Sequence, residues 1–122
     1  TSAQSPYAAS KVGADHLALS FQKSFNLPIT IVRPFNAFGP RQSLRAVIPT
    51  IITQIFNNKK FIKLGNTFST RNFNYISDTI DGFIRFIGKN NLDGEIINLG
   101  SNYDISIVDT AKIISQLLIY RA

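Results

Sequence analysis

The sequence predicts an α/β fold, in which helices alternate with short strands. Three observations favour this class. Segments with a helical spacing of apolar side chains alternate along the chain with short runs of strand-forming residues. The run at residues 29–32, Ile-Thr-Ile-Val, shows no polar alternation and is typical of a strand buried on both faces of a parallel sheet. The chain has 122 residues, of which 44% are apolar, and this is enough for one modest core.

The first half of the chain contains clear signals for the ends of a helix. Ser5 and Pro6 have the pattern of a helix start, because proline has no N–H to leave unpaired in the first turn. Asn26 and Pro28 have the pattern of a helix end. The expected elements of this half are a helix at Tyr7–Phe25, a strand at residues 29–32, an irregular loop at residues 34–40, and a helix over about residues 45–58 whose first turn contains Pro49.

The second half predicts three strands and two helices. Alternating residues at 61–64 and 72–76 favour short strands. Ser77 or Asp78 is expected to cap a helix with one apolar face, and Ser106 to cap a last helix. The remaining expected elements are the apolar face at Ile80, Phe83, Ile84 and Ile87, a turn at residues 90–94, a strand at residues 95–99, and the helix from Ile107 to about Leu118.

The composition excludes several classes of protein. The chain has no cysteine, which excludes disulfides and thiolate metal sites and agrees with a reducing cytosol. No apolar run reaches the roughly 20 residues of a membrane span, and the start lacks the basic and apolar regions of a signal peptide. Methionine is absent and the first residues have the character of mid-protein sequence. We therefore expect a cytoplasmic fragment of a longer protein, without a membrane partner.

The net charge of +6 leaves two interpretations open. The excess lysines either solubilise the surface or face a phosphate-bearing ligand. A nucleic-acid partner is less well supported, because the basic residues are scattered rather than gathered along one helix. The lysines in question are Lys59, Lys60, Lys63 and Lys89.

Tyr7 and Lys11 form the first candidate catalytic pair. They lie four residues apart, so they share one face of the expected helix. An ammonium group beside a phenol stabilises the phenolate. The phenol can then exchange a proton with a sugar hydroxyl while hydride leaves or arrives at the same carbon. Taken alone, the spacing is weak evidence, because a surface Tyr beside a surface Lys occurs readily by chance.

Four segments give this pair a context. They are residues 5–15 (SPYAASKVGAD), 33–42 (RPFNAFGPRQ), 69–78 (STRNFNYISD) and 98–100 (NLG). In this order they resemble the active-site helix, the Arg-x-x-Asn-x-Tyr-Gly-Pro loop, the Thr-Arg-Asp-aromatic-x-Tyr-Val-x-Asp segment and the Asn-Ile-Gly turn of the extended short-chain dehydrogenase/reductase family. That family contains NAD-dependent nucleotide-sugar epimerases and dehydratases. Because the segments cover nearly the whole chain, coincidence is a poor explanation.

The chain departs from the family pattern at two positions and lacks one motif. Phe38 stands in place of the usual Tyr, and Asn72 in place of the commoner Asp. No Gly-x-x-Gly-x-x-Gly follows a first strand, so the site for the dinucleotide phosphates is not in this sequence. We therefore expect an incomplete enzyme that does not turn over substrate alone.

The resemblance implies the C-terminal part of a Rossmann-like NAD-binding fold plus a small α/β substrate-binding lobe. Residues 1–40 would be the last helix and strand of the Rossmann-like domain, including the Tyr-x-x-x-Lys helix. Residues 41–122 would form the substrate-binding lobe, with segments at about residues 73–100 returning to the Rossmann sheet. The active-site cleft would lie between the lobes, where open α/β sheets bind ligands.

The resemblance also implies roles for individual residues around an NAD cofactor. Tyr7 would be the catalytic acid/base, and Lys11 would stabilise its phenolate and hydrogen-bond the nicotinamide ribose. Pro34 and Phe35 would border the nicotinamide. No metal ligand is implied, and His16 is expected to be a packed helix residue rather than a catalyst.

On the substrate side, the resemblance implies that Asn36 and Arg71 lie near the diphosphate, where a guanidinium fork matches phosphate oxygens. The alternative for Asn36 is a role in stabilising its loop, and for Arg71 a place on a solvated turn. Arg45 could equally face water, and Asp78 is expected to cap a helix rather than bind a ligand. The full set of expected substrate-binding residues is Asn36, Arg41, Ile62, Lys63, Leu64 and Arg71, with residues 61–64 lying along the nucleotide base.

Within the family, residues 34–43 and 45–54 look most like bacterial 4,6-dehydratases acting on UDP-N-acetylglucosamine. A C4-epimerase shares Tyr7 and Lys11 and is the alternative enzyme. A non-catalytic module that binds a nucleotide sugar or nucleic acid is the alternative outside enzymes, although a mere binder does not need a tuned phenol. The family resemblance further implies a homodimer of the complete protein.

Overall fold

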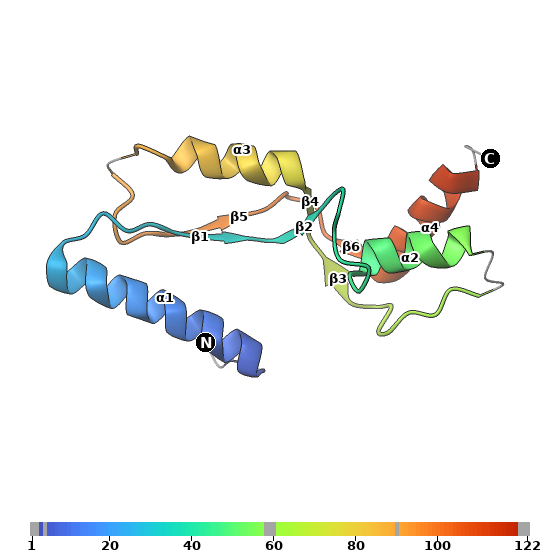
Figure 1. Ribbon diagram of the computed structural model, residues 1–122, viewed down its shortest axis with the longest axis horizontal. Helices are drawn as coiled ribbons and strands as arrows, with labels where there is room; N and C mark the ends of the chain where they lie inside the picture. The colour runs from blue at the N-terminus through green and yellow to red at the C-terminus, as the bar shows by residue number, and fades with distance from the viewer. Residues whose placement is uncertain (1–2, 4, 58–60, 90, 120–122) are drawn as a thin grey trace. The chain divides into compact units, whose positions relative to one another are not determined.

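Helices and short strands alternate in the structure, a computed structural model that describes residues 3, 5–57, 61–89 and 91–119. The expected α/β class is confirmed. The helices are α1 (Pro6–Phe25), α2 (Val47–Phe56), α3 (Ile76–Phe86) and α4 (Ile107–Ile119), shown in Figure 1. The strands are β1 (Ile31–Pro34), β2 (Asn36–Phe38), β3 (Thr70–Arg71), β4 (Phe73–Tyr75), β5 (Ile96–Leu99) and β6 (Ile105–Ser106).

The chain divides into two compact units. Unit 1 comprises Thr1–Pro34 and Asp81–Leu99, and unit 2 comprises Phe35–Ile80 and Gly100–Ala122. The division separates the helix with Tyr7 from the strands of residues 36–38 and 70–75. The domain boundaries expected from the sequence concern the complete protein and stay a prediction.

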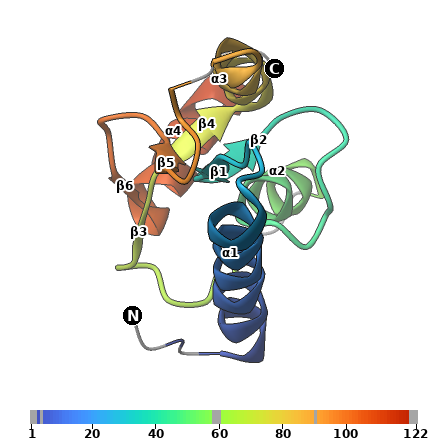
Figure 2. The same ribbon diagram turned by 90° about the vertical axis from the view of Figure 1, so that its left-hand side faces the viewer.

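Unit 1 is built on a pair of parallel strands. β1 pairs with β5 in a register that places Ile31 opposite Ile96 and Pro34 opposite Leu99. Within this unit, α1 and residues 81–86 of α3 lie on opposite faces of the pair, as Figures 1 and 2 both show. Helices on both faces explain why the strand sequence is apolar without alternation.

The start and the end of α1 follow the sequence signals. The Ser5 side chain accepts a hydrogen bond from the Ala8 N–H at 3.1 Å, and Pro6 occupies the first helical position. Asn26 ends the helix in the left-handed conformation, with φ of 51°. These predictions are confirmed because capping depends only on neighbouring residues.

Unit 2 combines two further strand pairs with two helices. β2 pairs with β4 in parallel, and β3 pairs with β6 in antiparallel orientation. Helix α2 packs against α4, and the buried side chains of Ile51 and Ile107 come from these two helices. Pro49 lies in the first turn of α2, as expected. The expected end of this helix at Asn58 lies outside the described residues, as do Lys59 and Lys60.

Two strand predictions in the N-terminal half are shifted or incomplete. The expected strand at residues 29–32 instead runs from Ile31 to Pro34. The segment before it still contacts the partner chain, because the Gly94 N–H donates to the Ile29 carbonyl at 2.7 Å. The loop expected at residues 34–40 contains β2, which forms only because residues 73–75 supply a partner strand. Short strands of this kind depend on distant residues rather than on local pattern.

The strand expected at residues 61–64 is wrong. No strand is assigned to this segment, and the side chain of Gln54 takes the backbone hydrogen bonds of Lys63. The Lys63 N–H donates to Gln54 Oε1 at 2.8 Å, and Gln54 Nε2 donates to the Lys63 carbonyl at 3.0 Å. A side-chain amide thus replaces the neighbouring strand.

The two cap predictions in the C-terminal half had opposite outcomes. Neither Ser77 nor Asp78 precedes α3, because the chain passes directly from β4 into the helix at Ile76. Both residues lie in the first turn, where the negative carboxylate of Asp78 interacts favourably with the positive end of the helix dipole and stabilises the helix. Ser106 does cap α4, since its Oγ accepts a hydrogen bond from the Asp109 N–H at 3.0 Å.

The described residues contain neither a membrane-spanning helix nor a cluster of metal-ligating side chains. No helix in that part of the chain is long and apolar enough to cross a membrane. No group of three or more His, Cys, Asp or Glu side chains in the same part of the chain could hold a metal ion.

Candidate active site

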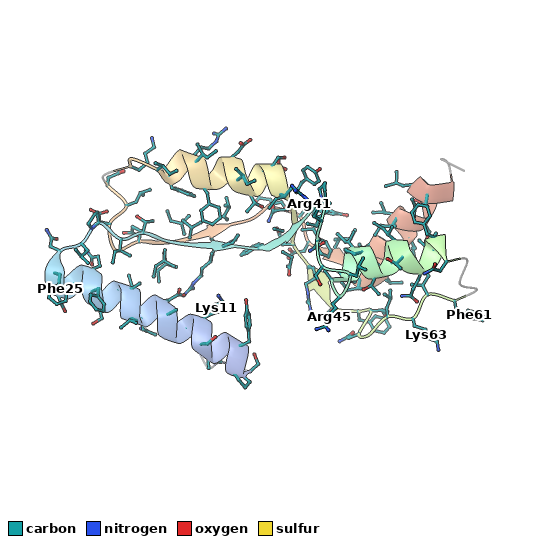
Figure 3. All side chains as sticks on the ribbon, in the orientation of Figure 1. Lys11, Phe25, Arg41, Arg45, Phe61 and Lys63 are labelled. Carbon is teal, nitrogen blue, oxygen red and sulfur yellow. The ribbon has the colours of Figure 1, made fainter. Side chains whose placement is uncertain are left out.

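Tyr7 and Lys11 lie together on α1, and the Lys11 Nζ is 5.6 Å from the centre of the Tyr7 ring. Both line a hollow of about 630 Å³ in unit 1, which β1 closes on its other side with Val32 and Pro34. Figure 3 shows Lys11 on the side of α1 that faces this strand. The Tyr7 side chain is 73% exposed, so its phenol is accessible to a ligand. The structure thus brings three of the expected site residues to one hollow.

The charge of Lys11 is left uncompensated within the described residues. Asp15 lies one turn further along the same helix, at a spacing that suits a pair with Lys11. Its carboxylate instead accepts hydrogen bonds from Nε and Nη2 of Arg33, at 2.8 and 2.6 Å. Because Arg33 holds Asp15, the ammonium group of Lys11 stays available beside the phenol. Sequence analysis missed this pair, which joins α1 to β1.

Phe35 lies against a glycine in unit 2. A Cβ at Gly100 would stand only 2.7 and 2.9 Å from Cε2 and Cγ of the Phe35 ring. The ring therefore packs directly on the glycine backbone, in the turn that resembles the family's Asn-Ile-Gly motif. Whether Phe35 borders a nicotinamide stays a prediction.

Asn36 opens β2, and its side chain is oriented by a neighbouring strand. Its backbone N–H and its Nδ2 both donate to the carbonyl of Asn72, at 3.1 and 3.2 Å. Only one of the two amide hydrogens is used in this way, so the other hydrogen stays available for a ligand. The contact gives Asn36 a role in holding its loop, and leaves the expected role in substrate binding as a prediction.

Arg71 ends β3 with an exposed side chain. Its Nη1 donates to the carbonyl of Thr70 at 2.8 Å. No carboxylate in the described part of the chain lies within ion-pair distance of this guanidinium. A guanidinium that is exposed and has no ion-pair partner among the described residues is able to bind a diphosphate. That role of Arg71 stays a prediction.

The other expected substrate residues do not gather at one point of unit 2. Arg41 is exposed after β2 and adopts a left-handed φ of 66°, which is strained for a residue with a side chain. Figure 3 shows it apart from Lys63, which lies in the segment after α2 with Ile62 and Leu64. Arg45, on the loop before α2, is exposed as well. Arg41 lines a separate apolar hollow of about 460 Å³ beside α2.

Asn72 and Asp109 are two further polar residues with unusual surroundings. Asn72 is buried and forms several hydrogen bonds, and the signal in the sequence was its departure from the family's Asp. The pKa of the Asp109 carboxyl is lowered, first by the hydrogen bond from Ser106 and then by the one from Lys112. His16 is exposed on α1 rather than packed, and carries no assigned role.

Comparison with known proteins agrees with the motifs. A family model described as GDP-mannose 4,6 dehydratase matches residues 1–119. The dTDP-D-glucose 4,6-dehydratase of Dictyostelium discoideum is 41% identical over 114 residues, which cover 93% of this chain and 26% of that protein. The chain therefore spans about a quarter of the length of this curated relative.

Two solved structures have the same fold. The dTDP-glucose 4,6-dehydratase of Bacillus anthracis, in complex with NAD, superposes with a TM-score of 0.88 at 31% identity, over 94% of this chain and 37% of that one. The UDP-glucuronic acid 4-epimerase of Bacillus cereus, in complex with UDP-glucuronic acid and NAD, superposes with a TM-score of 0.82 at 34% identity, over 92% and 36%. The expected Rossmann-like fold is confirmed by this likeness. From its motifs, its fold and the match over residues 1–119, the chain belongs to the GDP-mannose 4,6 dehydratase family of nucleotide-sugar dehydratases and epimerases.

Proposed function

We propose that the full-length protein is an NAD-dependent nucleotide-sugar 4,6-dehydratase, and that this chain supplies its Tyr7–Lys11 pair and part of its substrate site. The observation that carries the proposal is the hollow in unit 1, where an exposed phenol stands beside an ammonium group that has no counter-ion among the residues that the structure describes.

The lining of the hollow fits the nicotinamide half of NAD. Ala8, Val12, Val32 and Pro34 offer apolar surface to a flat ring, and the ammonium of Lys11 can donate hydrogen bonds to ribose hydroxyls. Tyr7, Lys11, Pro34 and Phe35 are the residues of this chain that would hold the cofactor. When bound, NAD supplies a hydride acceptor and later a hydride donor.

Tyr7 is the proton-transfer group of the proposal. Its phenolate would accept the proton of the sugar C4 hydroxyl as that carbon is oxidised and its hydride passes to NAD, and this proton would balance the hydroxide that leaves C6 as water. Lys11 would stabilise the phenolate before it accepts the proton, through its positive charge.

The substrate diphosphate is assigned to Arg71 and Asn36. Arg71 offers an unpaired guanidinium, and Asn36 keeps one amide hydrogen free beyond its bond to Asn72. Part of the net charge of +6 would then face a dianionic ligand. Ile62 and Leu64 remain candidates for contact with the nucleotide base, and Lys63 and Arg41 for more peripheral contacts.

Two substrates have to be compared. The loop sequence resembles enzymes for UDP-N-acetylglucosamine, whereas the Dictyostelium and Bacillus anthracis relatives are named for dTDP-glucose. The decisive experiment incubates the purified full-length protein with each nucleotide sugar and follows the product by mass spectrometry. A product lighter by one water supports the dehydratase.

A C4-epimerase is the second candidate, because the Bacillus cereus 4-epimerase matches the chain nearly as well as the dehydratases do. It gives an isomer of unchanged mass in the same assay, which chromatography separates from the substrate. Binding of the nucleotide sugar with neither product contradicts both enzymes and favours a binding module.

We further propose that the full-length protein is a cytoplasmic homodimer that binds neither nucleic acid nor membranes. Scattered basic residues support the absence of a nucleic-acid site. Sedimentation of the full-length protein tests the dimer, and a monomer would contradict it.

A further inference from the structure

Asn72 is a buried amide that uses all of its hydrogen-bonding groups. Only 7% of the residue is exposed. Its Nδ2 donates to the carbonyls of Ser101 and Tyr103 at 2.6 and 3.1 Å, and to Oδ1 of Asp104 at 3.1 Å. Its Oδ1 accepts from the N–H and the hydroxyl of Ser101 at 2.9 and 3.0 Å. These partners fix the orientation of the amide, since a flipped group would face its oxygen toward two carbonyls and a carboxylate.

The backbone of the same residue holds Asn36. The Asn72 carbonyl accepts from the backbone N–H and from the side-chain Nδ2 of Asn36. Arg71 is the preceding residue, so its backbone is set by the same anchor. One buried side chain therefore ties residues 101–104 to both residues that are assigned to the substrate diphosphate.

Asp104 explains why an amide is needed at position 72. Its carboxylate has no Lys or Arg within ion-pair distance in the described ranges. The family segment that residues 69–78 resemble has Asp at this position, but an ionised Asp cannot donate a hydrogen bond. It would face the carbonyls of Ser101 and Tyr103, and it would stand beside the carboxylate of Asp104 without a cation between them.

We propose that Asn72 and Asp104 form a matched amide–carboxylate pair, which positions Asn36 and Arg71 to bind the substrate diphosphate. The proposal rests on the proposed function. Asn72 acts through other residues, so it is a positioning residue and not a catalytic one. The pairing predicts that Asn72→Asp weakens substrate binding in this chain, and that a change at Asp104 relieves part of this loss.

The test is a double-mutant cycle in the full-length protein, with Asn72→Asp, Asp104→Asn and the double variant. The dissociation constants of UDP and dTDP are measured by calorimetry, and kcat and KM with the nucleotide sugar that is turned over. Asn72→Asp should weaken binding of the preferred nucleotide about tenfold or more and raise KM in parallel, with a smaller change in kcat. Asp104→Asn is the second single variant of the cycle and should weaken binding less than Asn72→Asp does, because its amide oxygen still accepts from Asn72.

The double variant should bind more tightly than Asn72→Asp, because the new amide at position 104 can turn its N–H₂ toward the new carboxylate at position 72. It should stay weaker than wild type, because the carbonyls of Ser101 and Tyr103 still face that carboxylate. If Asn72→Asp does not fold, the double variant must still fold and bind, or the pair is wrong. A double variant no better than Asn72→Asp, or an Asn72→Asp protein that binds like wild type, overturns the inference alone. Wild-type protein that binds neither nucleotide and converts no sugar overturns the proposed function as well.

Discussion

Gly82 lies where α3 packs against Leu99 of β5. The effect of Gly82→Ala on the free energy of unfolding should be destabilising with Leu at position 99 and stabilising with Ala there. A Cβ at Gly82 would stand 2.6 and 2.7 Å from the two methyl groups of Leu99 and 3.2 Å from its Cγ. Carbon atoms do not approach so closely without displacement. Leu99 must therefore shift within unit 1 before an alanine fits.

Two opposing effects set the magnitude. Replacing glycine by alanine inside a helix stabilises it by about 1 kcal/mol. Overpacking costs about 1–3 kcal/mol, and here a branched side chain has to move as a whole. We expect Gly82→Ala to lower the free energy of unfolding by about 1 kcal/mol, because the clash outweighs the gain in helix propensity.

The control is a Leu99→Ala background, which removes the clash with the Leu99 side chain and keeps the gain in helix propensity from Gly82→Ala. In a Leu99→Ala background, Gly82→Ala should instead raise the free energy of unfolding by about 1 kcal/mol. Gly13→Ala in α1 reports the propensity effect separately, because no atom lies within 4 Å of its Cβ position in the described structure. The assay is urea unfolding of the full-length protein followed by circular dichroism, with midpoints compared at equal slopes. The same effect of Gly82→Ala in both backgrounds would refute the packing argument.

The remaining predictions concern the cap of α4 and the charge pair of unit 1. Ser106→Ala should destabilise the protein by about 1 kcal/mol in urea unfolding, whereas Ser106→Thr should not, because only the former loses the bond from the Asp109 N–H. The pKa of Asp109 is lowered in the folded state, from an ordinary value of 3.8, so its stabilising contribution is present at neutral pH and is lost as the pH falls through the lowered pKa. The difference between wild type and Ser106→Ala should therefore shrink in acid, and a constant difference down to pH values below that pKa would contradict the link. Arg33→Ala should cost only about 0.5–1 kcal/mol, because Arg33 is 47% exposed. It should also lower kcat, because the freed Asp15 can pair with Lys11, and Arg33→Ala/Asp15→Asn should restore kcat if that reason is right.

Local signals were enough to predict the helices and the proximity of Tyr7 and Lys11. The cap at Ser5, the left-handed end at Asn26 and the cap at Ser106 each depend on residues within one turn. Tyr7 and Lys11 are also neighbours on one helix face, so their proximity follows once the helix is known. The resemblance to a known family then supplied a role for them.

The features that the sequence did not predict depend on contacts between residues far apart in the chain. β2 exists because residues 73–75 lie beside it, and residues 61–64 are not a strand because the Gln54 side chain takes their backbone hydrogen bonds. The Asp15–Arg33 pair and the contacts of Asn72 join residues about 20 to 30 positions apart, a separation that no local pattern encodes.

The central claim is that Tyr7 transfers the proton in a nucleotide-sugar dehydration. The most direct measurement is single-turnover product formation by the full-length Tyr7→Phe protein, with the protein in excess over the accepted nucleotide sugar and at a concentration well above its dissociation constant. Phenylalanine keeps the ring and removes only the hydroxyl, and binding of the same sugar by calorimetry controls for folding. We expect the Tyr7→Phe protein to bind the nucleotide sugar as tightly as wild type does and to form product about 10²-fold or more slowly. A Tyr7→Phe protein that releases water at the wild-type rate would contradict it.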